Sequence, residues 1–118
     1  MRFDRVTVMN ALDASKNESS ILIDSNQLLK ISAQVVMTGN AAGTVKFQAS
    51  NDFVQGVALG SGAVPTNWSD IASQTVAVSA GGVFLIPQFE LSYRWLRVQY
   101  VFASGTGTVT VNTMALSI

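Results

Sequence analysis

Hydrophobic and polar residues alternate along much of the chain, and this alternation predicts β-strands. One side of the segment 28–38 is almost wholly apolar: Leu29, Ile31, Ala33, Val35 and Met37. Such a period of two is typical of a strand with one buried face. The following segment places Val45, Phe47 and Ala49 inward in the same way, and the run 39–43 between the two segments is rich in turn residues. We therefore expect a β-hairpin here.

Six further segments combine β-branched or aromatic residues with flanking Gly, Asn, Ser or Pro clusters, as strands do. They are Asp4–Met9, Ser19–Asp24, Gln74–Val78, Gly82–Pro87, Arg94–Phe102 and Gly107–Leu116. No segment has the sustained spacing of an amphipathic helix. The expected fold is an all-β, antiparallel two-sheet sandwich, jelly-roll-like, with about eight strands and essentially no helix. Its 118 residues fit one domain, 1–118.

The last predicted strand changes phase. Val109 and Val111 share one face, whereas Met114 and Leu116 share the other. A bulge near residues 112–113 would keep all four side chains buried. A contact with a partner molecule is the alternative explanation.

Charge is scarce and balanced. Seven basic and seven acidic residues give a net charge of zero, and only 12% of the residues are charged. A neutral chain has no field that would gather nucleic acid or anionic lipid, so we expect neither as a partner. No window approaches the roughly 20 apolar residues of a membrane helix. So little charge also predicts that part of the surface is buried against other subunits.

The chain contains no cysteine and no histidine. Their absence removes thiolate and imidazole metal sites and the usual nucleophile and acid–base systems. We expect no catalytic residues, no metal site and no cofactor. The N-terminus, Met1–Arg5, runs straight into the alternating pattern and lacks the features of a signal peptide, so secretion by that route is not expected.

Three motifs follow one another in a distinctive order: Lys46–Asp52 (KFQASND), Asn67–Ile71 (NWSDI) and Tyr93–Val98 (YRWLRV). Together with the Gly105–Thr108 turn (GTGT), expected to be a hairpin, this order resembles small β-sandwich structural proteins of bacterial viruses. The resemblance covers about the last two-thirds of the chain. It implies a virion location after synthesis in a host cytoplasm.

The same order is also similar to discoidin-type, galactose-binding-like sandwiches. This sequence departs from that family at Phe53, where a glycine is common after the Asp. The residues themselves offer a ligand site formed by Asn51, Asp52, Trp68 and Asp70, in which Trp68 stacks on a sugar ring and the other three bond its hydroxyls; a calcium ion held by Asp52 and Asp70 is a further alternative. The alternatives are structural: Asn51 and Asp52 cap a turn, and Trp68 packs over the edge of the core.

Two regions are candidates for contacts between molecules. The segment 56–67 is rich in glycine but carries apolar side chains that are costly to leave in water: Val57, Leu59 and Val64. On the strand 94–102, Leu96, Val98, Tyr100 and Phe102 form one face, and Trp95 and Arg97 belong to the other. Trp and Arg are enriched in binding hot spots, so an outward pair would suit an interface. A surface ion pair between Arg97 and Glu90 is the simpler alternative.

These observations favour a non-enzymatic virion structural protein: a capsid-decorating, spike-like or tail-associated subunit that works as a homo-oligomer beside other virion proteins. Analogy favours a trimer. The nearly uncharged run Val76–Phe89 and the apolar segment 57–64 support assembly independently. The alternative is a discoidin-like carbohydrate-binding module whose partner is a surface glycan.

Overall fold

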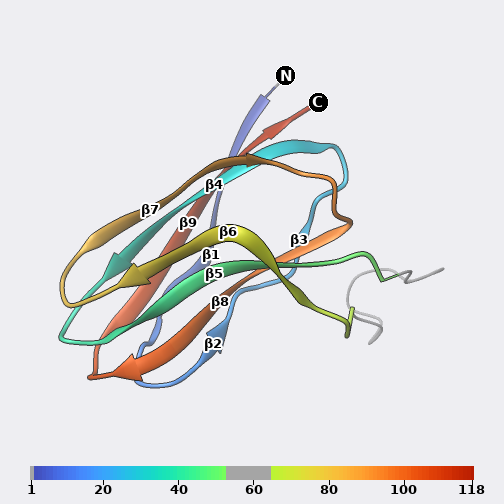
Figure 1. Ribbon diagram of the computed structural model, residues 1–118. Helices are drawn as coiled ribbons and strands as arrows, with labels where there is room; N and C mark the ends of the chain where they lie inside the picture. The colour runs from blue at the N-terminus through green and yellow to red at the C-terminus, as the bar shows by residue number, and fades with distance from the viewer. Residues whose placement is uncertain (1, 53–64) are drawn as a thin grey trace.

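The alternating pattern folds into nine strands in a computed structural model, which describes residues 2–52 and 65–118 (Figure 1). Within these residues there is no helix, and hence none that could cross a membrane. The strands are β1 (Arg2–Asp13), β2 (Glu18–Ser19), β3 (Ile23–Asp24), β4 (Leu28–Met37), β5 (Ala42–Ser50), β6 (Ser69–Val78), β7 (Val83–Glu90), β8 (Trp95–Ser104) and β9 (Thr108–Ser117). The expected all-β class is confirmed.

The strands form two antiparallel sheets that face each other. Sheet A has the order β1-β9-β4-β7, and sheet B has the order β2-β8-β5-β6, with β3 also paired to β8. Residues 19–24, expected as one strand, contain the end of β2 and the whole of β3, two short strands that both pair with β8. Counted as one interrupted strand, they leave eight strands in a jelly-roll-like order.

The core lies between the two sheets and follows the predicted alternation closely. Ile31, Ala33, Val35 and Met37 of β4 are buried, as are Val45, Phe47 and Ala49 of β5. Leu29 is an exception and is exposed, beside a register shift at the start of β4. Phe47 of sheet B meets Phe89 of sheet A edge to face, with ring centroids 5.0 Å apart. Aromatic contacts of this kind help to hold the two sheets together.

Both expected hairpins are wrong. β4 pairs with β7 and β9 in sheet A, whereas β5 pairs with β6 and β8 in sheet B. The turn after β4 therefore crosses from one sheet to the other, and so does the Gly105–Thr108 turn between β8 and β9. The two crossings pack on each other: the Asn40 N–H donates to the Thr106 carbonyl at 2.9 Å, and Asn40 Oδ1 accepts from the Thr106 N–H at 2.8 Å. A Cβ on Gly107 would lie 1.9 Å from the Thr38 carbonyl oxygen, so this crossing requires glycine.

The bulge predicted near residues 112–113 of the last strand does not occur. β9 alternates without a break, and its buried positions include Thr113, Ala115 and Ser117. The irregularities lie instead in its neighbour β1, where the pairing shifts between Thr7 and Met9 and again before Leu12. Met114 and Leu116 consequently point away from the core, on the outer face of sheet A.

Candidate functional site

The outer face of sheet B is a network of polar side chains that bond to one another. Arg97 Nε donates to Gln48 Oε1 at 2.8 Å, and Gln48 Nε2 donates to Asp70 Oδ1 at 2.8 Å. Lys46 Nζ lies 3.0 Å from Asp70 Oδ2. The Arg97 guanidinium also lies over the Trp68 ring, 4.5 Å from its centroid. Neighbouring strands β5, β6 and β8 thus supply side chains that satisfy each other.

This network shifts the ionisation of its members. The hydrogen bond from Gln48, and then that from Lys46, lower the pKa of the Asp70 carboxyl below its ordinary value. Desolvation lowers the pKa of the Arg97 guanidinium. Hydrogen bonds and an opposite charge favour the carboxylate form, so Asp70 is held ionised by its own sheet.

Asn51 and Asp52 cap backbone groups, as the structural alternative expected. Asn51 Oδ1 accepts from the Arg94 N–H at 2.8 Å. Asp52 Oδ2 accepts from the backbone N–H groups of Thr66 and Asn67 at 2.7 and 2.9 Å. The Asn67 N–H, its side chain and the Thr66 N–H together lower the pKa of the Asp52 carboxyl. Asp52 therefore ties the residues just before β6 to the end of β5.

The predicted ligand residues are only partly brought together. Asn51, Asp52 and Asp70 line one hollow of about 620 Å³, which Tyr93 also borders. Trp68 does not line it, because its ring is covered by Arg97 and its Nε1 donates to the Pro65 carbonyl at 3.2 Å. Both carboxylates already accept hydrogen bonds from the chain itself. Glycan binding by these residues stays a prediction.

The predicted interface residues have different outcomes. Val57, Leu59 and Val64 lie outside the described residues, as does Phe53. Trp95 is only 6% exposed, so the expectation that it stands outward is wrong: the Arg94 guanidinium lies over its ring, 3.9 Å from the centroid. Arg97 is half-buried and bonds to Gln48, not to Glu90, which lies in the other sheet.

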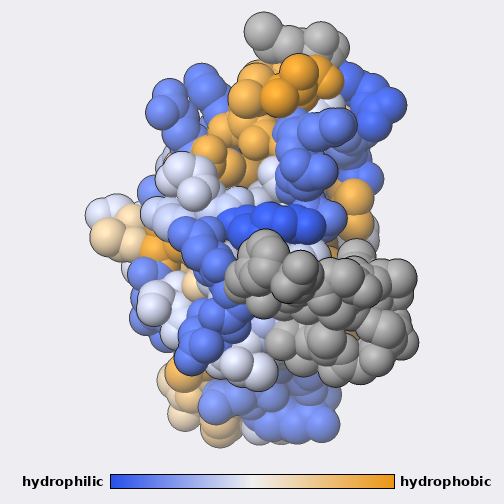
Figure 2. Space-filling view, turned by 90° about the vertical axis from the view of Figure 1, so that its right-hand side faces the viewer, coloured by the Kyte–Doolittle hydropathy of each residue, from blue (hydrophilic) through white to orange (hydrophobic). Residues whose placement is uncertain are grey.

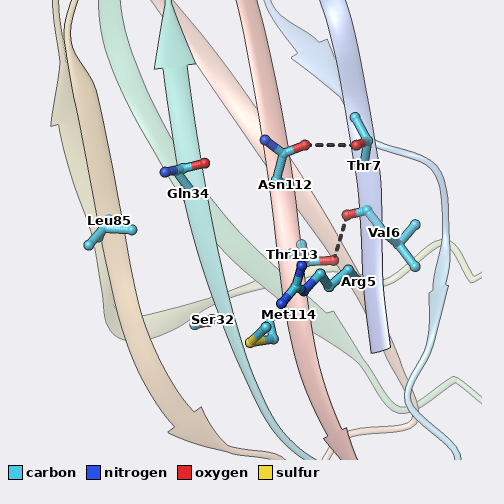
Figure 3. Close-up of a pocket in the computed structure, with 9 residues that line it drawn as sticks. All are labelled: Arg5, Val6, Thr7, Ser32, Gln34, Leu85, Asn112, Thr113 and Met114. Atoms are coloured by element: carbon cyan, nitrogen blue, oxygen red, sulfur yellow. Dashed lines mark hydrogen bonds between the residues drawn. The ribbon is translucent and has the colours of Figure 1, made fainter. Parts of the chain in front are cut away.

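Strongly exposed apolar side chains lie at both edges of the outer face of sheet A. Leu85 and Val83 of β7 are 65% and 61% exposed, and Phe3 of β1 is 62% exposed. Met114 and Leu116 of β9 lie between these edges in register. A hollow of about 420 Å³ opens on this face, and Figure 3 shows Leu85 at one rim and Thr7 near the other, with Gln34 and Asn112 between them.

A second apolar hollow opens at the edge of the sandwich. Its volume is about 400 Å³, and it lies between β1 and the segment 21–24, where Val6 and Ile21 are exposed. Seen from the side on which β3 lies, the surface is apolar near the two chain termini and hydrophilic across the middle (Figure 2). Other exposed apolar side chains lie outside these two hollows, Val101 and Phe102 of β8 among them.

Sequence reasoning did not identify the outer face of sheet A as one surface, although it offered two parts of this face as signs of association. Its signal was present in the phase of Met114 and Leu116, which a partner contact explains as well as a bulge does. The uncharged run that contains Val83 and Leu85 was a second signal, and both side chains are exposed. In the described part of the chain, no group of three or more Asp or Glu side chains is gathered as a metal site would require.

Comparison with protein-family models finds no match, and comparison with curated proteins finds none either. Among solved structures, the PBSX exported protein XepA is similar with a TM-score of 0.69 at 18% identity, over 98% of this chain and 37% of that one. This chain thus spans little more than a third of the length of XepA.

Two smaller proteins are similar over nearly their whole lengths. The SPBc2 prophage-derived protein YomS has a TM-score of 0.57 at 12% identity, over 98% of this chain and 94% of its own. PirA has a TM-score of 0.51 at 14% identity, over 92% and 90% of the two chains. The expected resemblance to small β-sandwich proteins of bacterial viruses is confirmed at the level of the fold: the sandwich of this chain is also found in the prophage-derived protein YomS.

Proposed function

We propose that this chain is a non-enzymatic structural protein of a bacterial virus, a capsid-decorating, spike-like or tail-associated subunit that acts by assembling with copies of itself. The observation that carries the proposal is the outer face of sheet A, where Phe3, Val83 and Leu85 are more than half exposed. The fold shared with XepA and YomS supports the viral setting.

Association would be driven by removing these apolar side chains from water. Burying one large aliphatic or aromatic side chain is worth about 1.5–3 kcal/mol. Contiguous exposed apolar area on a small protein marks an interaction surface more often than chance. The polar network of sheet B has less to offer a partner, because its groups already bond to each other.

A structural role also suits the chemistry of the carboxylates. Asp52 and Asp70, which line the hollow of about 620 Å³, each accept hydrogen bonds that favour the carboxylate form. A general acid needs a raised pKa, and theirs are lowered. We accordingly propose other virion proteins, rather than a substrate, as the further partners of the chain.

The first test is the solution mass of the purified protein across a concentration series, by light scattering coupled to size exclusion. The proposal expects a multiple of 12.5 kDa. Twice this mass would indicate a dimer, and three times this mass would indicate the trimer that analogy favours. A monomer at every concentration would contradict self-assembly.

The viral setting needs a separate test. An antibody against the purified chain should label particles prepared from cells that encode it, at one repeated position on each particle in electron micrographs. Label confined to particle-free fractions would overturn the virion assignment and leave self-assembly standing.

A further inference from the structure

We infer that the outer face of sheet A binds the same face of a second copy of this chain, around a two-fold axis that runs parallel to the strands. This inference deepens the proposed function and rests on its premise of self-assembly. It follows from where the unpartnered charges lie, from the register of the four strands and from the area of the face.

Almost every charged side chain of the described residues has a partner. Ion pairs join Arg2 to Asp4, Lys16 to Glu18, Lys46 to Asp70 and Arg94 to Asp24. Asp13, Asp52 and Arg97 make side-chain hydrogen bonds. Within residues 2–52 and 65–118, this leaves three charged side chains with neither kind of contact: Arg5, Lys30 and Glu90.

All three unpartnered charges belong to the outer face of sheet A. One row across the sheet, read from the register, is Phe3, Leu116, Lys30 and Glu90. The next row begins with Arg5 on β1 and continues through Met114 and Ser32. Arg5 therefore places a positive charge at the β1 edge, and Glu90 places a negative charge at the β7 edge, where Lys30 of β4 is its neighbour in register.

This layout is self-complementary in one orientation. In a symmetric contact each copy presents the same patch, so an edge with one sign must meet the edge with the other. A two-fold axis parallel to the strands lays β1 of one copy over β7 of its partner. Arg5 then lies near Glu90 of the partner subunit. An axis perpendicular to the strands would lay β1 over β1 and leave both charges unpaired.

The position of Leu85 fits the same orientation. Leu85 ends a row that runs from Thr7 through Asn112 and Gln34, and the hollow of about 420 Å³ lies along this row. In the two-fold pair, the exposed Leu85 of one copy meets the rim that carries Thr7 of the partner subunit. Along this row Thr7 Oγ1 donates to Asn112 Oδ1 at 2.7 Å, and the Gln34 side chain lies beside them, where it can bond across the contact (Figure 3).

The available area is sufficient for a specific contact of modest strength. Four strands about 4.8 Å apart and ten residues long at about 3.3 Å each cover roughly 600 Å² on each copy. The pair would bury about 1,200 Å², the lower limit of specific interfaces. We therefore expect a dissociation constant in the micromolar range and a dimer that forms fully only at higher concentration.

Cross-linking tests the orientation directly, because the chain has no cysteine of its own. Thr7→Cys and Leu85→Cys chains, carrying tags of different size, are mixed and treated with a bis-maleimide that spans about 10 Å, the spacing of packed sheets. The expected main product joins Cys at position 7 of one copy to Cys at position 85 of the other. Matched controls on sheet B, Thr75→Cys and Val101→Cys, should give no cross-link.

Charge exchange gives the second test. Arg5→Glu and Glu90→Arg should each weaken dimerisation about tenfold, measured by sedimentation across a concentration series, because like charges then face each other twice. The double variant should recover to within about threefold of the original.

The outcomes separate this inference from the proposed function. Products that join position 7 to position 7 and position 85 to position 85 would overturn the orientation. An oligomer that gives no cross-link at these positions would overturn the interface. So would an oligomer with an odd number of subunits, such as a trimer. Each of these results would leave self-assembly intact. A monomer at all concentrations would overturn both.

Discussion

The two outer faces of this sandwich are built from the same kind of strand but leave very different surfaces. On sheet B, Lys46, Gln48 and Asp70 bond to each other across β5 and β6, and Arg97 extends the network from β8 to Trp68. On sheet A, large apolar side chains surround Arg5, Lys30 and Glu90, none of which has a charged or hydrogen-bonded side-chain partner among the described residues. The charged side chains on the outer face of sheet B have partners within the described part of the molecule, whereas Arg5, Lys30 and Glu90 on sheet A do not.

The difference shows how a protein with few charges divides its surface between stability and association. Groups that bond within one chain contribute to folding but have little left to offer a partner. Apolar groups that stay exposed contribute nothing to folding of the single chain and gain only when a partner covers them. Variants on sheet A should therefore change association, and variants on sheet B should change stability.

The largest effect is expected from charges placed in the centre and at the rim of sheet A. Leu85→Lys with Leu116→Lys should lower the association constant at least about 100-fold, near 3 kcal/mol, because two apolar side chains are lost from each copy of the contact. Sedimentation at several concentrations measures it. The matched control is Val101→Lys, which changes an exposed apolar residue of β8 in sheet B. Equal loss in the control would remove the distinction between the faces.

A smaller effect of the opposite kind is expected on sheet B. Arg97→Ala removes the hydrogen bond to Gln48 and the contact with the Trp68 ring, so the free energy of unfolding should fall by about 1–2 kcal/mol. Denaturant titration measures it, and the mass should not change. Arg5→Ala on sheet A is the control and should cost less than about 0.5 kcal/mol. A larger loss of unfolding free energy for Arg5→Ala than for Arg97→Ala would mean that sheet A, and not sheet B, is the face that contributes to stability.

Much of the fold was accessible from the sequence because strand phase is a local property. The burial of Val35, Phe47 and Val98 follows directly from alternation. Which strands pair is not local: β4 and β5 read as a hairpin, yet each finds its neighbours far along the chain. Turn residues mark where the chain reverses, but they do not state whether it stays in the same sheet.

The candidate surfaces were harder to predict for a related reason. Trp95 has the correct phase for an outward residue, but the side chain of Arg94 covers it, and alternation carries no information on such cover. For Met114 and Leu116 the sequence leaves two explanations open, a bulge that buries them, as large apolar residues usually are, or a contact with a partner molecule. Their true position depends on β9 keeping a regular register while its partner β1 takes the bulges.

Acid should lower the stability of the fold modestly, through the carboxylates of Asp70 and Asp52. The pKa of Asp70 and that of Asp52 are lowered by folding, so each stabilises the fold above the unfolded pKa and loses that contribution as pH falls through the folded pKa. The melting temperature should accordingly fall between about pH 5 and pH 2. Asp70→Asn should give a shallower fall over the same range. An identical pH profile in the variant would show that Gln48 and Lys46 do not favour the charged carboxyl.

The smallest effect is expected from salt on the association of sheet A. The contact that we propose buries mainly apolar side chains, and apolar burial is not screened by ions. Only Arg5 and Glu90 contribute charge pairs, and at 1 M salt the screening length of about 3 Å leaves such exposed pairs little weight. The dissociation constant should therefore rise no more than about threefold between 0.1 M and 1 M salt, measured by sedimentation. Dissociation to monomers over this range would mean that the charges, and not Leu85 and its apolar neighbours, hold the copies together.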